Sequence, residues 1–422
     1  MKVFKFGGTS TNSYERVKNL AHILNFHKDE KILIVISAMG KMTNGLEKVV
    51  DAFYEQRNED ALKLFKKIKD YHLNQLKYLV TLHWEKATNQ LNDFFTEVEW
   101  LLHDKPVKDY NYYYDQIVCV GELLSSTLIS YFLDEEKLPN QWIDVRDLIR
   151  TDDTFRDGKV DWGVSKKFVS EKLLPLFQQN NFVVTQGFMG GTDENESTTL
   201  GREGSDYTAA IFADLLDAES VTIWKDVDGV MNADPKEFPG AKTIDELSYK
   251  EVIEMAYYGA KVIHPKTIKP LQNKNIPLFV RSFLDLRLPG TVISNKQNHH
   301  LPVMMITKQN QALITLQTID FSFAEAKPVN LLHEILDELS IKPNLTQNGA
   351  ITLMICIDDV AEKIEKLAIL ASSFFNVNIQ KGLMLLTLRH YTKEYLKMNE
   401  ANHEIIMEQR TSDTIQQLMK LT

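Results

Sequence analysis

The first apolar run of the chain ends in the stretch Lys5-Phe6-Gly7-Gly8-Thr9-Ser10. Residues 3–6 predict a short buried strand, and the two glycines that follow let backbone N–H groups approach an anion. Lys5 adds a mobile positive charge beside that loop. The two hydroxyl side chains at the end of the stretch are placed to cap a helix that begins near Tyr14. The stretch therefore indicates a phosphate-binding loop, although an ordinary strand-to-helix turn with a solvated lysine remains an alternative.

The composition is that of a globular protein too long for one ordinary core. The chain has 422 residues, of which 44% are hydrophobic and 25% are charged, and this predicts two or three domains. The formal net charge of −10 argues against a nucleic-acid or anionic-membrane partner, because both need a basic surface. No apolar run predicts a membrane span, and the chain starts on a strand without a signal-peptide layout. We therefore expect a cytoplasmic protein.

Few side chains suggest metal binding or a nucleophile. Cys119 and Cys356 are far apart and neither forms a C-x-x-C pair, so neither a disulfide framework nor a zinc site is expected. Cys119 lies in an apolar run, which favours a buried, inert thiol. His72 lies on the apolar stripe of a predicted helix and is interpreted as a packed side chain. The pair His299-His300 has no third ligand at a suitable spacing.

Strands and helices alternate through the first part of the chain. This order predicts a three-layer α/β/α sandwich with a parallel sheet over residues 1–295. Apolar residues three and four apart predict two long helices inserted at about residues 51–105. The predicted strands are residues 31–37, 183–186, 221–224 and 277–280, and helices are predicted at 207–216 and 249–258.

A polar stretch at residues 296–302 interrupts this pattern and is interpreted as a linker. The remaining residues, 303–422, predict a strand, a helix, a hairpin, a second helix and further strands. This βαββαβ order is typical of a ferredoxin-like α+β domain. The predicted elements are a strand at 312–318, a helix at 329–339, a hairpin over 341–356 turning at Asn348-Gly349, a helix at 360–371, strands near Val377 and at 383–390, a strand at 404–410 and a helix at 412–421.

Further loops rich in glycine and polar residues follow the predicted strands. The carboxyl ends of parallel strands meet at one edge of a sheet, so these loops are expected to lie together. Arg202 stands between glycines, where its guanidinium suits a carboxylate. Thr43, Ser205 and Asp206 offer polar groups near helix starts, where simple capping is the alternative. The loops are residues 37–45, 187–191, 198–207, 224–236 and 258–265.

Taken together, these loops resemble those of aspartate kinases in the amino acid kinase superfamily. The resemblance covers residues 1 to about 295 and implies the amino acid kinase fold, with ACT-type regulatory modules behind it. The matching motifs, in order, are Lys5 to Ser10, Ser37 to Met39 with Thr43-Asn44, Gly121-Glu122, Thr198 to Asp206, Trp224 to Gly229 and Gly259 to Pro265.

The resemblance also implies roles for individual residues. Lys5 would be the cation at the transferred phosphoryl group, with Gly7 and Gly8 around the phosphates and Asp206 organising the reaction centre. The residues implied to hold aspartate are Thr43, Glu122, Arg202 and Ser205, with Glu122 on the ammonium and Arg202 on the α-carboxylate. The residues implied to contact the nucleotide are Lys5, Gly7, Gly8, Thr9, Lys225, Asp226, Met231, Lys236, Lys261 and Val262.

The implied reaction transfers the γ-phosphoryl group of ATP to the side-chain carboxylate of L-aspartate, giving 4-phospho-L-aspartate. This is the first step of lysine, threonine and methionine biosynthesis. Mg²⁺ would be bound mainly through the ATP phosphates rather than by protein ligands. A carboxylate is already ionised at neutral pH, so the reaction needs no general base. The alternatives are a related kinase with another acceptor, such as glutamate, and a catalytically silent amino-acid sensor.

Some residues depart from the family pattern. Glu203 stands where glycine is usual, Lys225 where threonine is common and Met231 where tyrosine is usual. Asn344 stands at a position that is often acidic in lysine-inhibited members, so weak feedback by lysine is expected. The region 303–422 is short for two ACT modules, which predicts a truncated second module. We expect the region 303–422 to serve mainly to join copies of the chain into a homodimer or a higher homo-oligomer.

Overall fold

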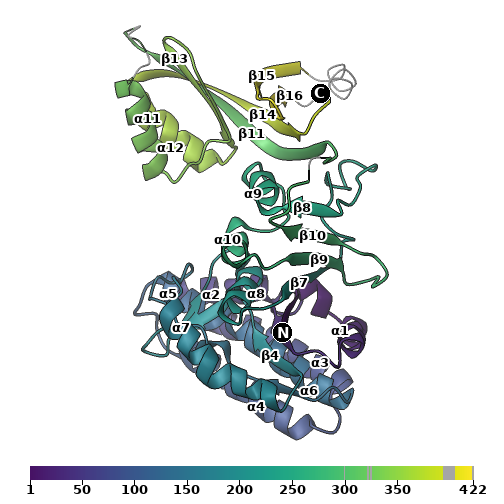
Figure 1. The fold of residues 1–422 in the computed structure, drawn as a ribbon. Helices are drawn as coiled ribbons and strands as arrows, with labels where there is room; N and C mark the ends of the chain where they lie inside the picture. The colour runs from purple at the N-terminus through teal and green to yellow at the C-terminus, as the bar shows by residue number, and fades with distance from the viewer. Residues whose placement is uncertain (299, 321–322, 324–325, 393–403, 421–422) are drawn as a thin grey trace. The chain divides into compact units, whose positions relative to one another are not determined.

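The computed structural model describes residues 1–298, 300–320, 323, 326–392 and 404–420. They divide into two compact units, each built around its own β-sheet (Figure 1). The first unit comprises Met1–Val230, Thr243–Ile253 and Val262–Asn298, and the second comprises the described residues of Met231–Lys242, Glu254–Lys261 and His299–Thr422.

The sheet of the first unit has eight strands in the order β3-β4-β2-β1-β7-β9-β10-β8. Neighbouring strands are parallel except β9 and β10, so the predicted parallel sheet is confirmed. The central strand β1 lies between β2 and β7, and its apolar residues Val3, Phe4 and Phe6 are buried. The strands are β1 (Lys2–Phe6), β2 (Ile32–Ile36), β3 (Asn140–Trp142), β4 (Phe182–Gln186), β7 (Ser220–Lys225), β8 (Glu246–Ser248), β9 (Leu278–Ser282) and β10 (Thr291–Ser294), with a separate hairpin of β5 (Met189–Gly191) and β6 (Ser197–Thr199).

Helices cover the sheet of this unit and complete the predicted three-layer sandwich (Figure 1). Helix α6 packs on β2, β3 and β4, whereas α8 packs on β1, β2 and β7. The two long helices predicted from apolar spacing are confirmed as α3 and α4. The helices are α1 (Tyr14–Phe26), α2 (Met42–Tyr54), α3 (Asn58–Leu79), α4 (Trp84–His103), α5 (Tyr110–Val118), α6 (Val120–Glu135), α7 (Trp162–Phe168), α8 (Gly204–Leu215), α9 (Tyr249–Tyr257) and α10 (Pro265–Lys274), with short helical turns at Gly8–Thr11, Val145–Asp147, Val169–Leu173 and Leu174–Gln178.

Among the described residues, one helical stretch is long and apolar enough to cross a membrane by length and composition alone. It is Tyr110–Glu135, which joins α5 and α6, and 89% of its most apolar window is buried inside the protein. A helix that is apolar on every side is also what a protein core requires when neighbours surround it. The packing of α6 against both the sheet and α4 therefore accounts for its composition.

The cap of one helix and the start of another differ from the sequence prediction. Helix α1 begins at Tyr14 as expected, but Ser13 caps it by accepting a hydrogen bond from the Arg16 N–H at 3.4 Å. The prediction that Thr9 and Ser10 cap this helix is wrong, because both belong to the preceding 3₁₀ turn. Helix α8 begins at Gly204, ahead of the predicted start, so Ser205 and Asp206 lie in its first turn without capping it.

The second unit contains an antiparallel sheet, in which the described strands follow the order β12-β13-β11-β14-β16-β15. The order β12-β13-β11-β14 with helices α11 and α12 confirms the predicted βαββαβ unit. Ile314, Leu336, Ile355 and Leu367 belong to the core between these helices and the sheet. The elements are β11 (Met304–Thr318), α11 (Ala326–Glu338), β12 (Leu345–Asn348), β13 (Thr352–Asp358), α12 (Ala361–Ala371), β14 (Phe375–Arg389), β15 (Glu404–Arg410) and β16 (Thr414–Lys420).

The C-terminal strands correct two predictions. The strands expected near Val377 and at 383–390 form one continuous strand, β14, which pairs with β11 along almost its whole length. The helix expected at 412–421 is instead β16, because this segment fills the space between β14 and β15 and exchanges hydrogen bonds with both. The strand at 404–410 is confirmed as β15. His299 of the predicted linker, residues 393–403 and residues 421–422 lie outside the described residues.

Candidate active site

A cluster of two partly buried lysines and one buried aspartate lies at the carboxyl ends of β1 and β7. Lys5 Nζ lies 2.7 Å from Asp206 Oδ1, and Lys225 Nζ lies 3.8 Å from Asp206 Oδ2. Lys225 also donates a hydrogen bond to the Val262 carbonyl at 2.7 Å. Lys5 comes from the central strand, Lys225 ends the adjacent strand and Asp206 lies in the first turn of α8. Residues from four distant parts of the sequence are thus brought into one cluster.

The electrostatics of this cluster favour ionised side chains. Burial alone would raise the pKa of Asp206, but the charges of Lys5 and Lys225 outweigh it and hold that pKa below its ordinary value. Two cations around one carboxylate leave the cluster with a net positive charge. A group with several negative oxygens would complete this charge balance, as a phosphate does.

Glycines allow the loops around the cluster to approach one another. A Cβ on Gly8 would lie 2.5 Å from the Ala38 carbonyl oxygen, and the Gly40 N–H donates to the Gly8 carbonyl at 2.9 Å. A Cβ on Gly187 would lie 2.6 Å from Cβ of Ser205. Side chains at these two positions would force apart the loops that follow β1, β2 and β4, so the close approach explains why glycine is needed.

Glu122 is buried beside the loop that follows β2. Its Oε1 accepts a hydrogen bond from the Ala38 N–H at 3.2 Å, and its Oε2 has no hydrogen-bond partner. Burial raises the pKa of Glu122 to about 8, against the opposing effects of backbone N–H groups and the nearby Lys5 charge. A buried carboxyl group with an unsatisfied oxygen suits a ligand that brings a positive charge, because such a ligand would stabilise the ionised form.

The loop before α8 presents Arg202 and Glu203 to solvent. Glu203 has φ 55° and ψ 29°, which is the left-handed conformation that glycine adopts at least cost. This backbone geometry explains why the family pattern has glycine at this position. The Glu203 side chain is exposed, and both Arg202 and Glu203 act electrostatically on His264.

The other residues implied by the resemblance differ in exposure and are divided between the two compact units. Thr43 is half-buried in the first turn of α2, and Thr9 and Asp226 are exposed. Within residues 1–298, all of which are described, no hydrogen bond or ion pair links the Thr43 or Arg202 side chain to the cluster. The predicted nucleotide contacts Met231, Lys236 and Lys261 belong to the second compact unit.

One residue that organises the site was not singled out from the sequence. Asp115 in α5 is fully buried, and its carboxylate accepts hydrogen bonds from the N–H and Oγ1 of Thr199, both at 2.8 Å, and from the Arg156 N–H at 2.9 Å. Burial raises the pKa of Asp115 to about 6. It anchors the start of the loop that carries Arg202. The available signal was an acidic residue in the stretch 112–118, where every other residue except Gln116 is aromatic or apolar.

Two expectations outside the site, for His72 and Cys119, are confirmed. His72 is buried and its Nδ1 donates to the Ile68 carbonyl at 2.8 Å, while burial lowers its pKa to about 4. Cys119 is buried as a free thiol, and burial raises its pKa well above the ordinary value. His264 shapes a loop: it caps α10, its Nδ1 accepting a hydrogen bond from the Lys266 N–H at 3.2 Å.

Comparison with known proteins identifies the family. The model of the amino acid kinase family matches residues 1–282. The lysine-sensitive aspartokinase 3 of Escherichia coli (strain K12) is 31% identical over 394 residues, which cover 92% of this chain and 86% of that protein. The chain therefore belongs to the amino acid kinase family and, within it, to the aspartokinases.

Solved structures agree with this assignment. Aspartokinase III of Escherichia coli in complex with lysine and aspartate has a TM-score of 0.81 and 28% identity, covering 99% of this chain and 95% of that one. The same enzyme with aspartate and ADP also has a TM-score of 0.81, with 27% identity over 100% of this chain and 96% of that one. The aspartate kinase of Clostridium acetobutylicum, at 21% identity, has a TM-score of 0.79 over 100% of this chain and 96% of that one and shares the fold.

Proposed function

We propose that Lys5, Asp206 and Lys225 form the phosphoryl-transfer centre of an aspartate kinase that converts ATP and L-aspartate to ADP and 4-phospho-L-aspartate. The observation that carries this assignment is the buried ion pair of Lys5 and Asp206 at 2.7 Å, with Lys225 as a second cation on the same carboxylate. A glutamate acceptor and a silent sensor are the alternatives. Membership in the aspartokinases favours aspartate as the acceptor, and the intact charge cluster favours an active enzyme.

The chain's own residues would act mainly by positioning and by neutralising charge. Lys5 would stabilise the negative charge on the transferred phosphoryl group, with the backbone of Gly7 and Gly8 around the phosphates and Asp206 holding Lys5 in place. Lys225 would neutralise charge on the nucleotide side. The aspartate side chain attacks as a carboxylate, so no side chain needs to remove a proton.

Aspartate would be recognised at its α-carbon. Glu122 would bind the α-ammonium group through the oxygen that lacks a hydrogen-bond partner. Arg202 would bind the α-carboxylate as a bidentate fork, with Thr43 and Ser205 as further contacts. Asp226, Met231, Lys236, Lys261 and Val262 are proposed to contact the nucleotide together with Thr9. Arg202 is exposed and comes from a loop that Asp115 anchors, so its engagement would complete the site when substrate binds.

A magnesium ion is proposed to accompany the nucleotide. Among the described residues no three His, Cys, Asp or Glu side chains converge on a metal site, and the Asp206 carboxylate already faces two cations. Such a donor set fits an ion held mainly by triphosphate oxygens, with at most a carboxylate from the protein. When bound, Mg²⁺ would supply charge neutralisation on the phosphate oxygens.

Trapping the acyl phosphate tests this function directly. The full chain is incubated with ATP, Mg²⁺ and hydroxylamine in the presence of aspartate, glutamate or no acceptor, and the hydroxamate is measured. We expect a strong signal with aspartate and little with glutamate. A signal with glutamate alone would identify glutamate as the acceptor in place of aspartate. ADP release without any hydroxamate would contradict the formation of an acyl phosphate.

The assignment of the remaining regions is part of the same proposal. Residues 1–295 would be the catalytic domain, residues 296–302 a linker, and residues 303–422 an ACT-type regulatory region with a reduced second module. This region would form a homodimer or a higher homo-oligomer, and the enzyme would be cytoplasmic. Lysine is proposed to inhibit only weakly, because the Asn344 Oδ1 already accepts a hydrogen bond from Lys308 Nζ at 2.6 Å. Unchanged aspartate kinetics across a lysine titration is the expected result, and strong inhibition would contradict it.

A further inference from the structure

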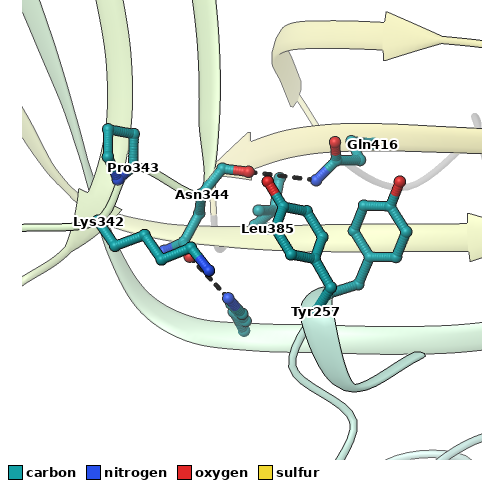
Figure 2. Close-up of a pocket in the computed structure, with 8 residues that line it drawn as sticks. Tyr257, Lys342, Pro343, Asn344, Leu385 and Gln416 are labelled. Carbon is teal, nitrogen blue, oxygen red and sulfur yellow. Dashed lines mark hydrogen bonds between the residues drawn. The ribbon is translucent and has the colours of Figure 1, made fainter. Parts of the chain in front are cut away.

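Polar side chains outside the proposed reaction centre gather in both compact units. In the second unit, the Asn344 carbonyl accepts a hydrogen bond from the Gln416 side chain at 3.4 Å, beside a cavity of about 60 Å³ (Figure 2). In the first unit, Asp157 forms ion pairs with Lys159 and Lys266. The group in the first unit adjoins the loop before α8, so it bears on the proposed aspartate site.

The two lysines reach Asp157 from different parts of the chain. Lys159 pairs with Oδ2 and belongs to the same loop as Asp157, whereas Lys266 pairs with Oδ1 from the first turn of α10, 109 residues away. Burial would raise the pKa of Asp157, but hydrogen bonds from both lysines outweigh it and hold that pKa below its ordinary value. Asp157 is therefore ionised at neutral pH, and only its pair with Lys266 connects two distant segments.

Gly201 lies against the Asp157–Lys266 ion pair. Its φ is +79°, and a Cβ there would lie 3.1 Å from Asp157 Oδ1 and 3.6 Å from Lys266 Nζ. The left-handed backbone conformation is one that glycine adopts at little cost. Gly201 directly precedes Arg202. The ion pair therefore contacts the backbone from which Arg202 extends.

The loop that carries Asp157 is attached to the strand before Gly201. The Gly158 N–H donates to the Thr199 carbonyl at 2.9 Å. The Arg156 N–H donates at 2.9 Å to the Asp115 carboxylate, which also accepts a hydrogen bond from the Thr199 N–H at 2.8 Å. Backbone contacts thus fix both neighbours of Asp157, and Lys266 adds the connection to α10.

We propose that Asp157 and Lys266 are positioning residues for aspartate, because their ion pair holds Gly201 and so fixes the backbone ahead of Arg202. The Arg202 side chain itself is exposed. A loop that is already ordered loses less conformational freedom when it binds a ligand, which raises its affinity. The importance for aspartate rests on the proposed role of Arg202, whereas the effect on the loop does not.

The size of the effect is limited by solvent. The Lys266 side chain is 40% exposed and that of Asp157 is 43% exposed, so water and salt screen their attraction. The ion pair should therefore alter the affinity for aspartate by a small factor rather than decide whether the enzyme is active.

Hydrogen exchange of the free full-length chain tests the effect on the loop without any substrate. Lys266→Met removes the ammonium group and keeps the length of the side chain. We expect the amides of residues 200–206 to exchange at least about threefold faster in this variant. The matched control is Lys159→Met, which removes the other lysine from the same carboxylate and should leave exchange unchanged. Equal exchange in Lys266→Met and the natural chain would overturn the proposal.

Steady-state kinetics tests the importance for aspartate. Lys266→Met should raise the KM for aspartate about fivefold and change kcat and the KM for ATP less than about twofold. Lys266→Arg, which keeps the charge, and Lys159→Met should both stay within about twofold of the natural chain. Asp157→Asn should have the effect of Lys266→Met, and the double variant should add little, because both changes remove the same ion pair.

The two measurements separate the possible failures. Faster exchange with an unchanged KM for aspartate would overturn the positioning role, and so would equal losses in kcat and in both KM values. A natural chain without kinase activity would contradict the proposed function instead. Hydrogen exchange would then still decide whether the Asp157–Lys266 ion pair holds the loop.

Discussion

The two sides of the candidate active site differ in how far they are assembled before substrate binds. On the phosphate side, Lys5, Asp206 and Lys225 are already in contact, and the Asp206 side chain is only 4% exposed. On the aspartate side, Glu122 is buried with one oxygen unsatisfied, while Arg202 is exposed to solvent. The first is a set of mutually satisfied charges, and the second is a set of groups that lack their partner.

This difference has a physical cause. Opposite charges in a buried place stabilise one another, so the phosphate side is stable without a ligand. The aspartate side must bind an ammonium and a carboxylate at once, and groups of opposite charge placed together in the free protein would neutralise each other. In the proposed site, no ion pair joins Glu122 to Arg202 within residues 1–298, so both groups would stay available for aspartate. The comparison predicts that turnover depends mainly on the first side and aspartate affinity on the second.

The largest effect is expected from removing the central cation. Lys5→Ala should lower kcat roughly a hundredfold or more, because the loss of one donor that stabilises charge on the transferred group typically lowers kcat by that factor. The measurement is steady-state turnover, with circular dichroism and thermal unfolding to confirm that the variant folds. Turnover within a few fold of the natural chain would refute the role of Lys5.

Glu122→Gln should act on the other side of the site. We expect the KM for aspartate to rise roughly thirtyfold, because a charge-assisted hydrogen bond to the ammonium group is lost, with kcat and the KM for ATP changing far less. Glutamine preserves the shape and can still accept the hydrogen bond from the Ala38 N–H. An equal loss in both KM values would indicate a general disturbance of the fold instead.

The pH dependence of aspartate binding should report the same carboxyl group. Burial raises the pKa of Glu122 to about 8, so the group is mostly protonated at pH 7, whereas an ammonium ligand needs the carboxylate. The KM for aspartate should therefore fall about tenfold between pH 7 and pH 9, as the binding-competent fraction increases. The dependence should disappear in Glu122→Gln. A KM that rises over this range in the natural chain would contradict the assignment.

Lys225→Thr restores the residue common in the family and tests whether the second cation is needed. Lys225 is 27% exposed and lies 3.8 Å from Asp206, so solvent screening limits its contribution. We expect the KM for ATP to rise about fivefold, with little change in the KM for aspartate. The opposite pattern would place Lys225 on the acceptor side of the site.

Glu203→Gly should give the smallest effect, and it should be an improvement. Glycine adopts the left-handed conformation of this residue without the cost of about 1 kcal/mol that a side chain brings, and the change removes a negative charge beside Arg202. We expect the KM for aspartate to fall about threefold and the midpoint of thermal unfolding to stay equal or rise. Glu203→Gln, which removes the charge but keeps the backbone cost, separates the two contributions.

The sequence predicted the first unit well and the end of the second unit less well. Strands such as Ile32–Ile36 are continuous apolar runs bounded by glycine and polar residues, and helices α3 and α4 carry a regular apolar spacing, so local pattern and tertiary environment agree. In β16 the residues Ile415, Leu418 and Met419 have a helical spacing, yet the segment lies between two strands that require a partner. Pairing with those strands outweighed the local preference.

The sequence by itself determined which chemical groups this protein has and on which loops they lie. A lysine and two glycines after the first strand, and an acidic residue at the start of α8, are local features that a linear pattern records. Only the tertiary structure decided their protonation states and partners: the lowered pKa of Asp206, the raised pKa of Glu122 and the anchoring of Thr199 by Asp115. These properties depend on burial and on the charges of residues that are distant in the sequence. Neither can be read from a single stretch of the sequence.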